Sequence, residues 1–425
     1  MNKKDNISKL LLIVLMFSVF LDVANFFMPL PIFSPLFLGG KHYLEFSLND
    51  RKLLLGFLMG LYGLAQLIGG PLLGHISDRT SRKKLLVVSL ALSFFSTLLS
   101  GYSLHLGSIV LIYVSRLLLG LSSATIALAF TIASDLSNDE SRAKNIGYIT
   151  IGTSLGAILG PGIGGYFTKS SNIAIFGNST PFYFMSILYL IAIAMVFISL
   201  KSIYDNKQKD INNNKITKIL GNLQCQKKYL FSILIIILLF QLSCESFYLA
   251  SPIIATIKFR MLPFEISNYF IIQGIVAIFT SLMINKQLSK ILTSTSIIKI
   301  NFIMLLICYL FLSITTSRIL FTIPFIGVGI FGTLCWIHTN CVLSKTVSST
   351  NQGVIFGISQ AVWGIASSIG PIAVGIAAAF FGHEFASFVP ILLISCSFLL
   401  ILMMPSLIKK NTSINQRTES IICVD

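Results

Sequence analysis

Long apolar stretches recur along the chain, each close to twenty residues in length and separated by short polar stretches. A helix needs about twenty apolar residues to cross roughly 30 Å of hydrocarbon. The pattern therefore predicts an all-α membrane protein with twelve transmembrane helices, near residues 9–30, 52–74, 85–104, 108–133, 145–168, 181–200, 229–253, 266–285, 297–313, 319–343, 352–381 and 386–406. The first stretch is too long for a signal peptide and carries Asp22, so we interpret it as a retained helix.

One long polar segment separates the sixth predicted helix from the seventh. It is rich in Asn and Lys and poor in aromatic residues, a composition typical of a disordered linker. The sequence therefore predicts two six-helix bundles, 1–201 and 229–407, joined by a cytoplasmic linker at 202–228 and followed by a cytoplasmic tail at 408–425.

A faint internal repeat supports this division. The stretches GAILGPGIGG (156–165) and ASSIGPIAVG (366–375) each place Gly-Pro inside an apolar helix, 210 residues apart from Gly160 to Gly370. Repeats of this kind occur in transporter folds whose substrate site lies at the repeat interface. The alternative is that two unrelated membrane helices each carry Gly and Pro.

Composition and charge agree with a membrane protein. The chain is 55% hydrophobic and only 11% charged, with a mean hydropathy of +0.86, which excludes a water-soluble globular protein. If both termini are cytoplasmic, 23 of the 31 Lys and Arg residues lie inside and seven lie outside, as the positive-inside rule requires. The net charge of +16 therefore indicates topology and no nucleic-acid partner. We expect a multi-pass protein of the cell inner membrane.

The chain carries no pattern typical of an enzyme, a metal site or a disulfide framework. Its seven cysteines form no CxxC pair, its five histidines are scattered, and neither a P-loop nor HExxH is present. No segment outside the predicted helices exceeds about thirty residues, too few for the soluble domain of a sensor. We therefore expect no cofactor and no catalytic activity.

The loop after the second predicted helix reads GPLLGHISDRTSRKKLL. It resembles the motif G-x-x-x-D-R-x-G-R-R/K of the major facilitator superfamily. The matching residues are Gly74, Asp78, Arg79, Arg82 and Lys83, with Ser81 in place of the usual second glycine. The resemblance implies a charge latch whose acidic partner is Asp135, at the end of the fourth helix. The alternative for Asp135 is a solvated carboxylate, although a carboxylate at a helix C-terminus is unfavourable without a cationic partner.

Two further patterns resemble the same family. Arg116 stands inside the fourth predicted helix with Gly120 four residues on, as in the family motif R-x-x-x-G. The resemblance implies a part in proton coupling or in polarising the cavity; the alternative is an arginine that reaches the outer headgroups. In the fifth helix a motif typical of drug/proton antiporters, G-x-x-x-G-P-x-x-G-G, matches Gly156, Gly160, Pro161, Gly164 and Gly165. With Gly152, the glycines at every fourth position form a face against which another backbone can pack.

Two buried acids complete the candidate site. Asp22 and Glu245 lie in apolar context, where a carboxylate must be protonated or paired. Asp22 matches an acid in the first helix of tetracycline/proton antiporters, and Gln66 lies in a stretch that resembles their second helix. A structural hydrogen bond is the alternative for Asp22, and for Glu245 the structural and functional interpretations stay open.

Departures from the tetracycline antiporters make tetracycline itself a doubtful substrate. Ser96 stands where those proteins carry an aspartate in the third helix, and the eighth helix has no histidine. His338 is interpreted as a polar core residue.

The sequence thus predicts a monomeric secondary transporter that works by alternating access and takes its energy from the proton gradient. The leading hypothesis is proton-coupled efflux of a drug or amphipathic metabolite, with Asp22, Gln66, Arg116 and Glu245 as proton or substrate sites. The alternative is proton-coupled uptake of a nutrient, metabolite or siderophore, because nothing in the residues fixes the direction.

Overall fold

The computed structural model describes residues 3–39, 45–135, 137, 139–168, 177–199, 227–344 and 352–403. The first half of the chain forms α1 (Lys3–Phe27), α2 (Leu30–Ser34), η1 (Pro35–Gly39), α3 (Leu48–Arg79), α4 (Arg82–Leu106), α5 (Ile109–Leu121), α6 (Ala124–Asp135), α7 (Asp139–Phe167) and α8 (Thr180–Ser199). The second half forms α10 (Lys227–Ile257), α11 (Pro263–Phe279), η2 (Thr280–Ile284), α12 (Asn285–Ile291), α13 (Ser294–Ile314), α14 (Thr322–Gly327), η3 (Val328–Gly332), α15 (Thr333–Ser344), α16 (Gln352–Phe381), η5 (His383–Ser387) and α17 (Phe388–Leu402). We call these two sets the N-half and the C-half.

Within the described residues, twelve helical spans are long and apolar enough to cross a membrane, which confirms the all-α membrane fold. The first span is longer than predicted and runs from Leu10 to Gly39. The prediction placed its end near residue 30. Instead α2 and the π-helical turn η1 extend it, and this extension packs against α10 of the C-half.

The fourth span also differs from the prediction of one continuous helix. It is interrupted at Ser122 and Ser123, between α5 and α6. Ser122 donates to the carbonyl of Leu119 at 2.7 Å and lies 2.7 Å from the hydroxyl of Ser93 on α4. Serine hydroxyls that bond to backbone carbonyls weaken the regular helical ladder, so these contacts account for the interruption.

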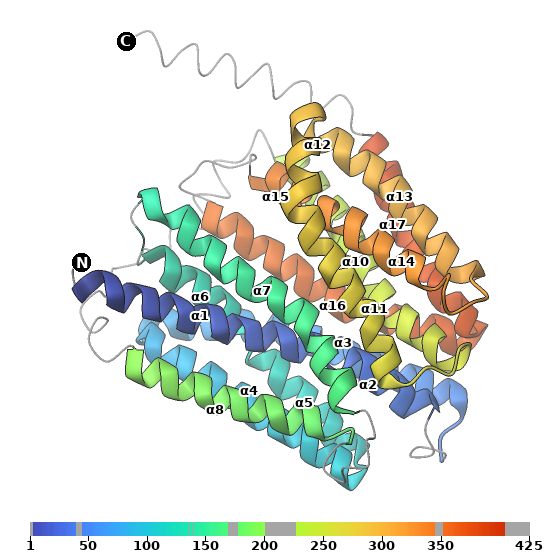
Figure 1. Cartoon of the computed structure of the whole chain (residues 1–425), viewed down its shortest axis with the longest axis horizontal. Helices are drawn as coiled ribbons and strands as arrows, with labels where there is room; N and C mark the ends of the chain where they lie inside the picture. Colours follow the sequence, from blue (N-terminus) through green and yellow to red (C-terminus); the bar gives the residue numbers. More distant parts are fainter. Residues whose placement is uncertain are drawn as a thin grey trace.

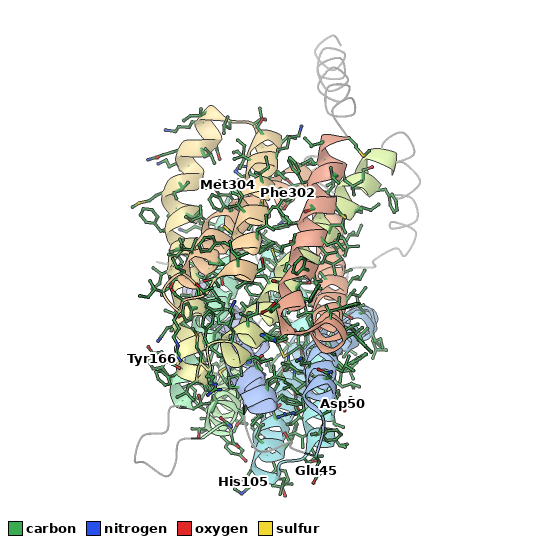
Figure 2. The ribbon with its side chains drawn as sticks, turned by 90° about the vertical axis from the view of Figure 1, so that its right-hand side faces the viewer. Glu45, Asp50, His105, Tyr166, Phe302 and Met304 are labelled. Atoms are coloured by element: carbon green, nitrogen blue, oxygen red, sulfur yellow. The ribbon has the colours of Figure 1, made fainter. Side chains whose placement is uncertain are left out.

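The helix ends gather at two ends of the molecule. Figure 2 shows Glu45, Asp50 and His105 together at one end, which also carries the positive-φ turns at Gly107 and Gly382. The charge asymmetry predicts that this end is extracellular, and we call it the predicted outer end. The predicted linker and tail lie almost wholly outside the described residues.

The two halves meet along two seams. Helix α3 packs along α16, and α7 packs against α11. Contacts between α7 and α11 include Ile158 with Gly274 and Gly165 with Ser267, so they run from the last third of α7 along most of α11. Figure 1 shows these two helices converging toward the predicted outer end and diverging away from it.

Candidate functional site

The acid of the first helix lies deep in the N-half. Asp22 is 2% exposed, and neither of its carboxylate oxygens has a hydrogen-bond partner among the described residues. One turn further on, Asn25 donates to the hydroxyl of Thr97 at 2.6 Å and to that of Tyr189 at 3.4 Å. Tyr189 in turn donates to the carbonyl of Leu21 at 3.2 Å. The polar groups around Asp22 are therefore bonded to one another, and the carboxylate is left without a donor.

The predicted coupling arginine is equally buried. Arg116 is 1% exposed, and none of its three guanidinium nitrogens has a hydrogen-bond partner among the described residues. Its guanidinium carbon lies 5.5 Å from the centroid of the Tyr62 ring. A cation over an aromatic face gains about 0.5–2 kcal/mol, which offsets part of the roughly 2.5–3.5 kcal/mol that a central charge costs on insertion scales. Tyr62 thus shields a buried cation that has no hydrogen-bonded anion among the described residues.

The acid of the C-half has a donor. Glu245 is 5% exposed, and its Oε1 accepts a hydrogen bond of 2.8 Å from the indole N–H of Trp363 on α16. Its Cβ also lies close to Gly370, 3.1 Å from the position that an added Cβ would take there. A larger residue at 370 would displace the acid.

Tyr62 is the residue on which these groups converge. Asp22, Arg116 and Glu245 each lie near enough to its hydroxyl to interact with it electrostatically. Gln66 lies one turn further along α3, beside Gly364 of α16, and its amide oxygen is buried without a partner among the described residues. The structure therefore groups Asp22, Arg116 and Glu245 around Tyr62, and it places Gln66 on the same helix as Tyr62, facing the C-half.

Aromatic side chains fill the same region. Phe26 packs against Tyr62 and Trp363, with ring centroids 4.7 and 5.1 Å apart. Beside it, Phe27 packs against Tyr248 of α10 at 5.4 Å. The site is thus a small set of buried charges within an aromatic cluster, a composition suited to amphipathic ligands.

The glycine motif has two different uses. Gly156, Gly160 and Gly164 face α1, where an added Cβ would lie 2.6, 2.5 and 2.3 Å from the carbonyl oxygens of Phe20, Ala24 and Met28. This confirms close backbone packing on one face of α7, which continues through Pro161 inside the helix. Gly165 instead faces α11 of the C-half, where the Cβ of Ser267 would lie 2.4 Å away.

The predicted latch falls partly outside the described side chains. Gly74, Asp78 and Arg79 belong to the end of α3 and Asp135 is the last residue of α6, but their side chains are not among those described. Arg82 and Lys83 begin α4, and the Lys83 ammonium lies 5.9 Å from the centroid of the Phe197 ring. The latch therefore stays a prediction.

Sequence reasoning missed three residues of this site: Asn25, Tyr62 and Trp363. Asn25 follows Asp22 by three positions, and this helical spacing places both on one face. Trp363 is one of only two tryptophans in the chain, a signal that was available. His338 agrees with the prediction of a polar core residue, because it is 4% exposed and lies 3.2 Å from the hydroxyl of Ser294.

Comparison with known proteins places the chain among transporters. Residues 15–371 match the Major Facilitator Superfamily. The chain is 28% identical over 298 residues to multidrug resistance protein 2 of Bacillus subtilis, which covers 68% of this chain and 70% of that protein. It is 31% identical over 159 residues to the class B tetracycline resistance protein of Escherichia coli, covering 37% of each chain. It is 29% identical over 196 residues to the quinolone resistance protein NorA of Staphylococcus aureus, covering 46% of this chain and 45% of that one.

Solved structures share the fold at low identity. A bacterial homologue of the human lysosomal transporter Spinster, in an inward-facing and occupied conformation, matches with a TM-score of 0.74 and 11% identity over 92% of this chain and 95% of that one. The human organic anion transporter MFSD10 matches with a TM-score of 0.65 and 16% identity over 93% of this chain and 99% of that one.

Proposed function

The chain belongs to the major facilitator superfamily of membrane transporters, and we propose that it exports an amphipathic, drug-like compound in exchange for protons by alternating access. The relatives named for multidrug, tetracycline and quinolone resistance favour export over the alternative of nutrient uptake. In this proposal the protein acts as a monomer in the inner membrane with both termini cytoplasmic.

One observation carries the proton coupling: the Asp22 carboxylate is 2% exposed and has no hydrogen-bond partner among the described residues. An ionised carboxylate in that position costs several kcal/mol unless it binds a proton or a cation. A group that must gain a proton or a ligand when it is shielded, and can lose it when water reaches it, is what coupled exchange needs.

The arrangement of the halves supports alternating access. The seam between α7 and α11 is closed at the predicted outer end, where Tyr166 donates to Asn268 at 2.7 Å across the two halves. With the predicted orientation this is an inward-facing arrangement, the conformation named for one of the structural neighbours. Export then requires the seam at the outer end to open while the opposite end closes.

The buried charges and the aromatic cluster support the substrate class. Phe26, Phe27, Tyr62 and Tyr248 offer ring faces and edges beside a carboxylate. Such surroundings favour a planar or amphipathic solute over a sugar, which needs a dense set of hydrogen-bond partners.

Proton flux in inverted membrane vesicles tests the proposal. Vesicles acidified by respiration are given ethidium, tetracycline or norfloxacin, and the release of lumenal protons is followed with a pH-sensitive dye. We expect at least one of these compounds to release protons in vesicles with the natural protein and not with Asp22→Asn, because an amide cannot exchange a proton.

Asp50→Asn is the matched control, since this aspartate lies exposed at the predicted outer end and accepts a hydrogen bond from Ser47. It should behave as the natural protein does. Efflux that continues at the same rate after the proton gradient is collapsed would contradict the proposal.

A further inference from the structure

Trp363 lies at the interface between the halves and contacts both of them. Its indole N–H donates to Glu245 within the C-half at 2.8 Å, and its ring lies edge-on against Phe26 of the N-half, with centroids 5.1 Å apart at 65°. Phe26 packs in turn on Tyr62, and Tyr62 lies under the Arg116 guanidinium. Direct contacts therefore lead from the buried acid of one half to the buried cation of the other.

The members of this series are held tightly. Phe26, Tyr62 and Leu119 form one buried cluster against which Trp363 and Phe27 pack. Aromatic pairs of this geometry contribute about 0.5–1.5 kcal/mol beyond their buried area. Phe26 and Tyr62 are buried within this cluster, so a change in the angle of the half-buried indole ring alters its contact with Phe26.

The hydrogen bond to Glu245 depends on the charge of the carboxylate. A bond from a neutral N–H to an ionised oxygen is roughly twice as strong as one to a neutral acceptor. Ionised Glu245 therefore fixes the indole ring against Phe26, and a protonated or ligand-bound Glu245 holds it more weakly. The ring contact with the N-half is then weakened in the same step.

We propose that Trp363 is a positioning residue that transmits the charge state of Glu245 across the interface to Phe26, and through it to Tyr62 and Arg116. An ionised Glu245 stabilises the contact of the halves seen here, and its neutralisation favours their separation. The consequence for transport rests on the proposed proton exchange, but the link between Glu245 and Trp363 does not.

Few titratable groups lie near Glu245. Tyr62 from α3, with Cys244 and Tyr248 from its own helix, interact with it electrostatically. The described part of α16 carries no titratable side chain. The other elements packed against α10 carry Cys335, His338 and Cys341 on α15, His383 and Glu384 on η5, and Cys396 on α17, and Tyr309 of α13 donates to the Cys244 sulfur. Tyrosine and cysteine ordinarily titrate above pH 8, so they keep their charge in a titration below that pH. The histidines and Glu384 do not, and substitutions are therefore needed to distinguish their titration from that of Glu245.

Fluorescence gives a direct test, because the chain has only two tryptophans. Trp336 is 39% exposed, and Trp336→Phe leaves Trp363 as the only tryptophan. The purified variant is titrated from pH 5 to pH 8 in lipid nanodiscs while its emission maximum and its quenching by acrylamide are recorded. We expect both to change with pH, and the change to disappear when Glu245→Gln is added.

Two controls separate this proposal from the proposed function. Adding Asp22→Asn should leave the pH-dependent emission in place, whatever it does to transport. Adding His338→Gln, His383→Gln or Glu384→Gln should also leave it in place, since these groups belong to α15 and η5 and lie outside the proposed series. A flat emission in the parent variant, or a change that persists with Glu245→Gln, overturns the proposal even if transport is proton-coupled.

Transport kinetics test the contact with the N-half. Trp363→Phe keeps a ring and removes the donor, whereas Phe26→Leu keeps the donor and removes the ring partner. If both act through one series of contacts, each lowers proton-driven efflux about tenfold and the double variant is no worse than either, because residues of one network are not additive. If the double variant instead loses about a hundredfold in efflux rate, the two residues act independently and the proposed series of contacts is wrong.

Discussion

Asp22 and Glu245 are buried carboxylates in the two halves, and their surroundings differ. Neither oxygen of Asp22 has a hydrogen-bond partner among the described residues, whereas Glu245 accepts from Trp363 at 2.8 Å. Arg116 adds an unpartnered cation to the N-half, again among the described side chains. The N-half therefore keeps its charges available to a proton or a solute, while the C-half holds its acid in a fixed orientation.

A shortage of polar groups in the N-half does not explain this difference. A series of hydroxyls joins α4 to α5: Ser96 donates to the carbonyl of Ser115 at 2.6 Å, and Ser100 donates to its hydroxyl at 2.8 Å. These hydroxyls bond to one another and to backbone, and none is directed to Asp22 or Arg116. These surroundings agree with the prediction that coupling lies chiefly in the N-half and with the positioning role proposed for Trp363 in the C-half.

The largest expected effect comes from removing the charge of Arg116. Arg116→Gln should lower proton-driven efflux about a hundredfold, a loss of about 2.7 kcal/mol of transition-state stabilisation, because no other described cation lies over Tyr62. Glu245→Gln should cost about tenfold, since the glutamine carbonyl still accepts from Trp363. Efflux of ethidium from loaded cells, with protein amounts matched by immunoblot, measures both.

Arg116→Lys is the control for the Arg116→Gln variant. Lysine keeps the charge but is a compact ammonium without the planar face that stacks on Tyr62, so we expect an intermediate rate. If Glu245→Gln is the more damaging of the two neutralisations, coupling does not lie chiefly in the N-half.

A smaller effect is expected from two neighbouring glycines that face different halves. Gly160→Ala places a Cβ 2.5 Å from the Ala24 carbonyl oxygen inside the N-half, and Gly165→Ala places one 2.4 Å from the Cβ of Ser267 in the C-half. The first should destabilise the fold by about 1–3 kcal/mol through overpacking. The second should instead favour separation of α7 from α11.

Thermal unfolding and spin-label distances distinguish these outcomes. Labels at Leu159→Cys and Ile275→Cys, which are 45% and 59% exposed, report the separation of α7 and α11 in a background without native cysteines. Gly165→Ala should lengthen the distance and Gly160→Ala should not. Equal distances in both variants would show that the seam at Gly165 does not control the arrangement of the halves.

Hydrophobic pattern was enough to predict the fold, because a membrane span must be a continuous apolar helix and leaves a clear signal. The ends of the membrane spans were predicted less accurately. The first span continues to Gly39 because α2 and η1 pack against the C-half, a contact between distant segments that no local pattern shows. The interruption at Ser122 likewise depends on its pairing with Ser93 on another helix.

The sequence predicted those site residues whose type is costly in a membrane. It missed those whose type is ordinary there. Asp22, Arg116 and Glu245 stand out because charges are rare at membrane depth. Tyr62 joins them only through the packing of α1, α3, α5 and α10, and an aromatic residue in an apolar helix carries no signal of its own. The partners of a buried charge therefore required the structure.

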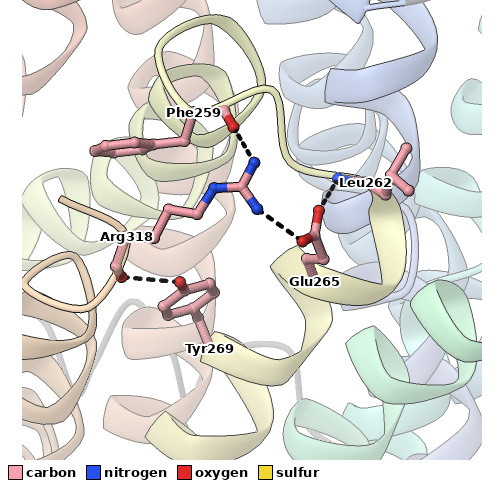
Figure 3. A network of polar contacts seen from close by, with 5 residues as sticks. All are labelled: Phe259, Leu262, Glu265, Tyr269 and Arg318. Atoms are coloured by element: carbon pink, nitrogen blue, oxygen red, sulfur yellow. Dashed lines mark hydrogen bonds and ion pairs between the residues drawn. The ribbon is translucent and has the colours of Figure 1, made fainter.

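The smallest expected effect concerns the predicted outer end, where the C-half is held by a network around an ion pair and the N-half by separate hydrogen bonds. Figure 3 shows Arg318 paired with Glu265 at 2.9 Å and donating to the Phe259 carbonyl at 2.6 Å, while Glu265 accepts from the backbone N–H of Leu262 at 2.8 Å. In the N-half, Arg51 donates to the Phe37 carbonyl at 3.2 Å.

Glu265→Gln removes the charge and keeps an acceptor for Leu262, so it should lower the free energy of unfolding by about 0.2–1 kcal/mol, as exposed ion pairs do. Glu265→Ala also removes the cap of α11 and should cost about 0.5–2 kcal/mol. Thermal unfolding in 0.1 M and 1 M salt separates the two contributions, because screening reduces only the ion pair. A cost of Glu265→Gln that is unchanged in 1 M salt would show that geometry, and not charge, holds this end of the C-half.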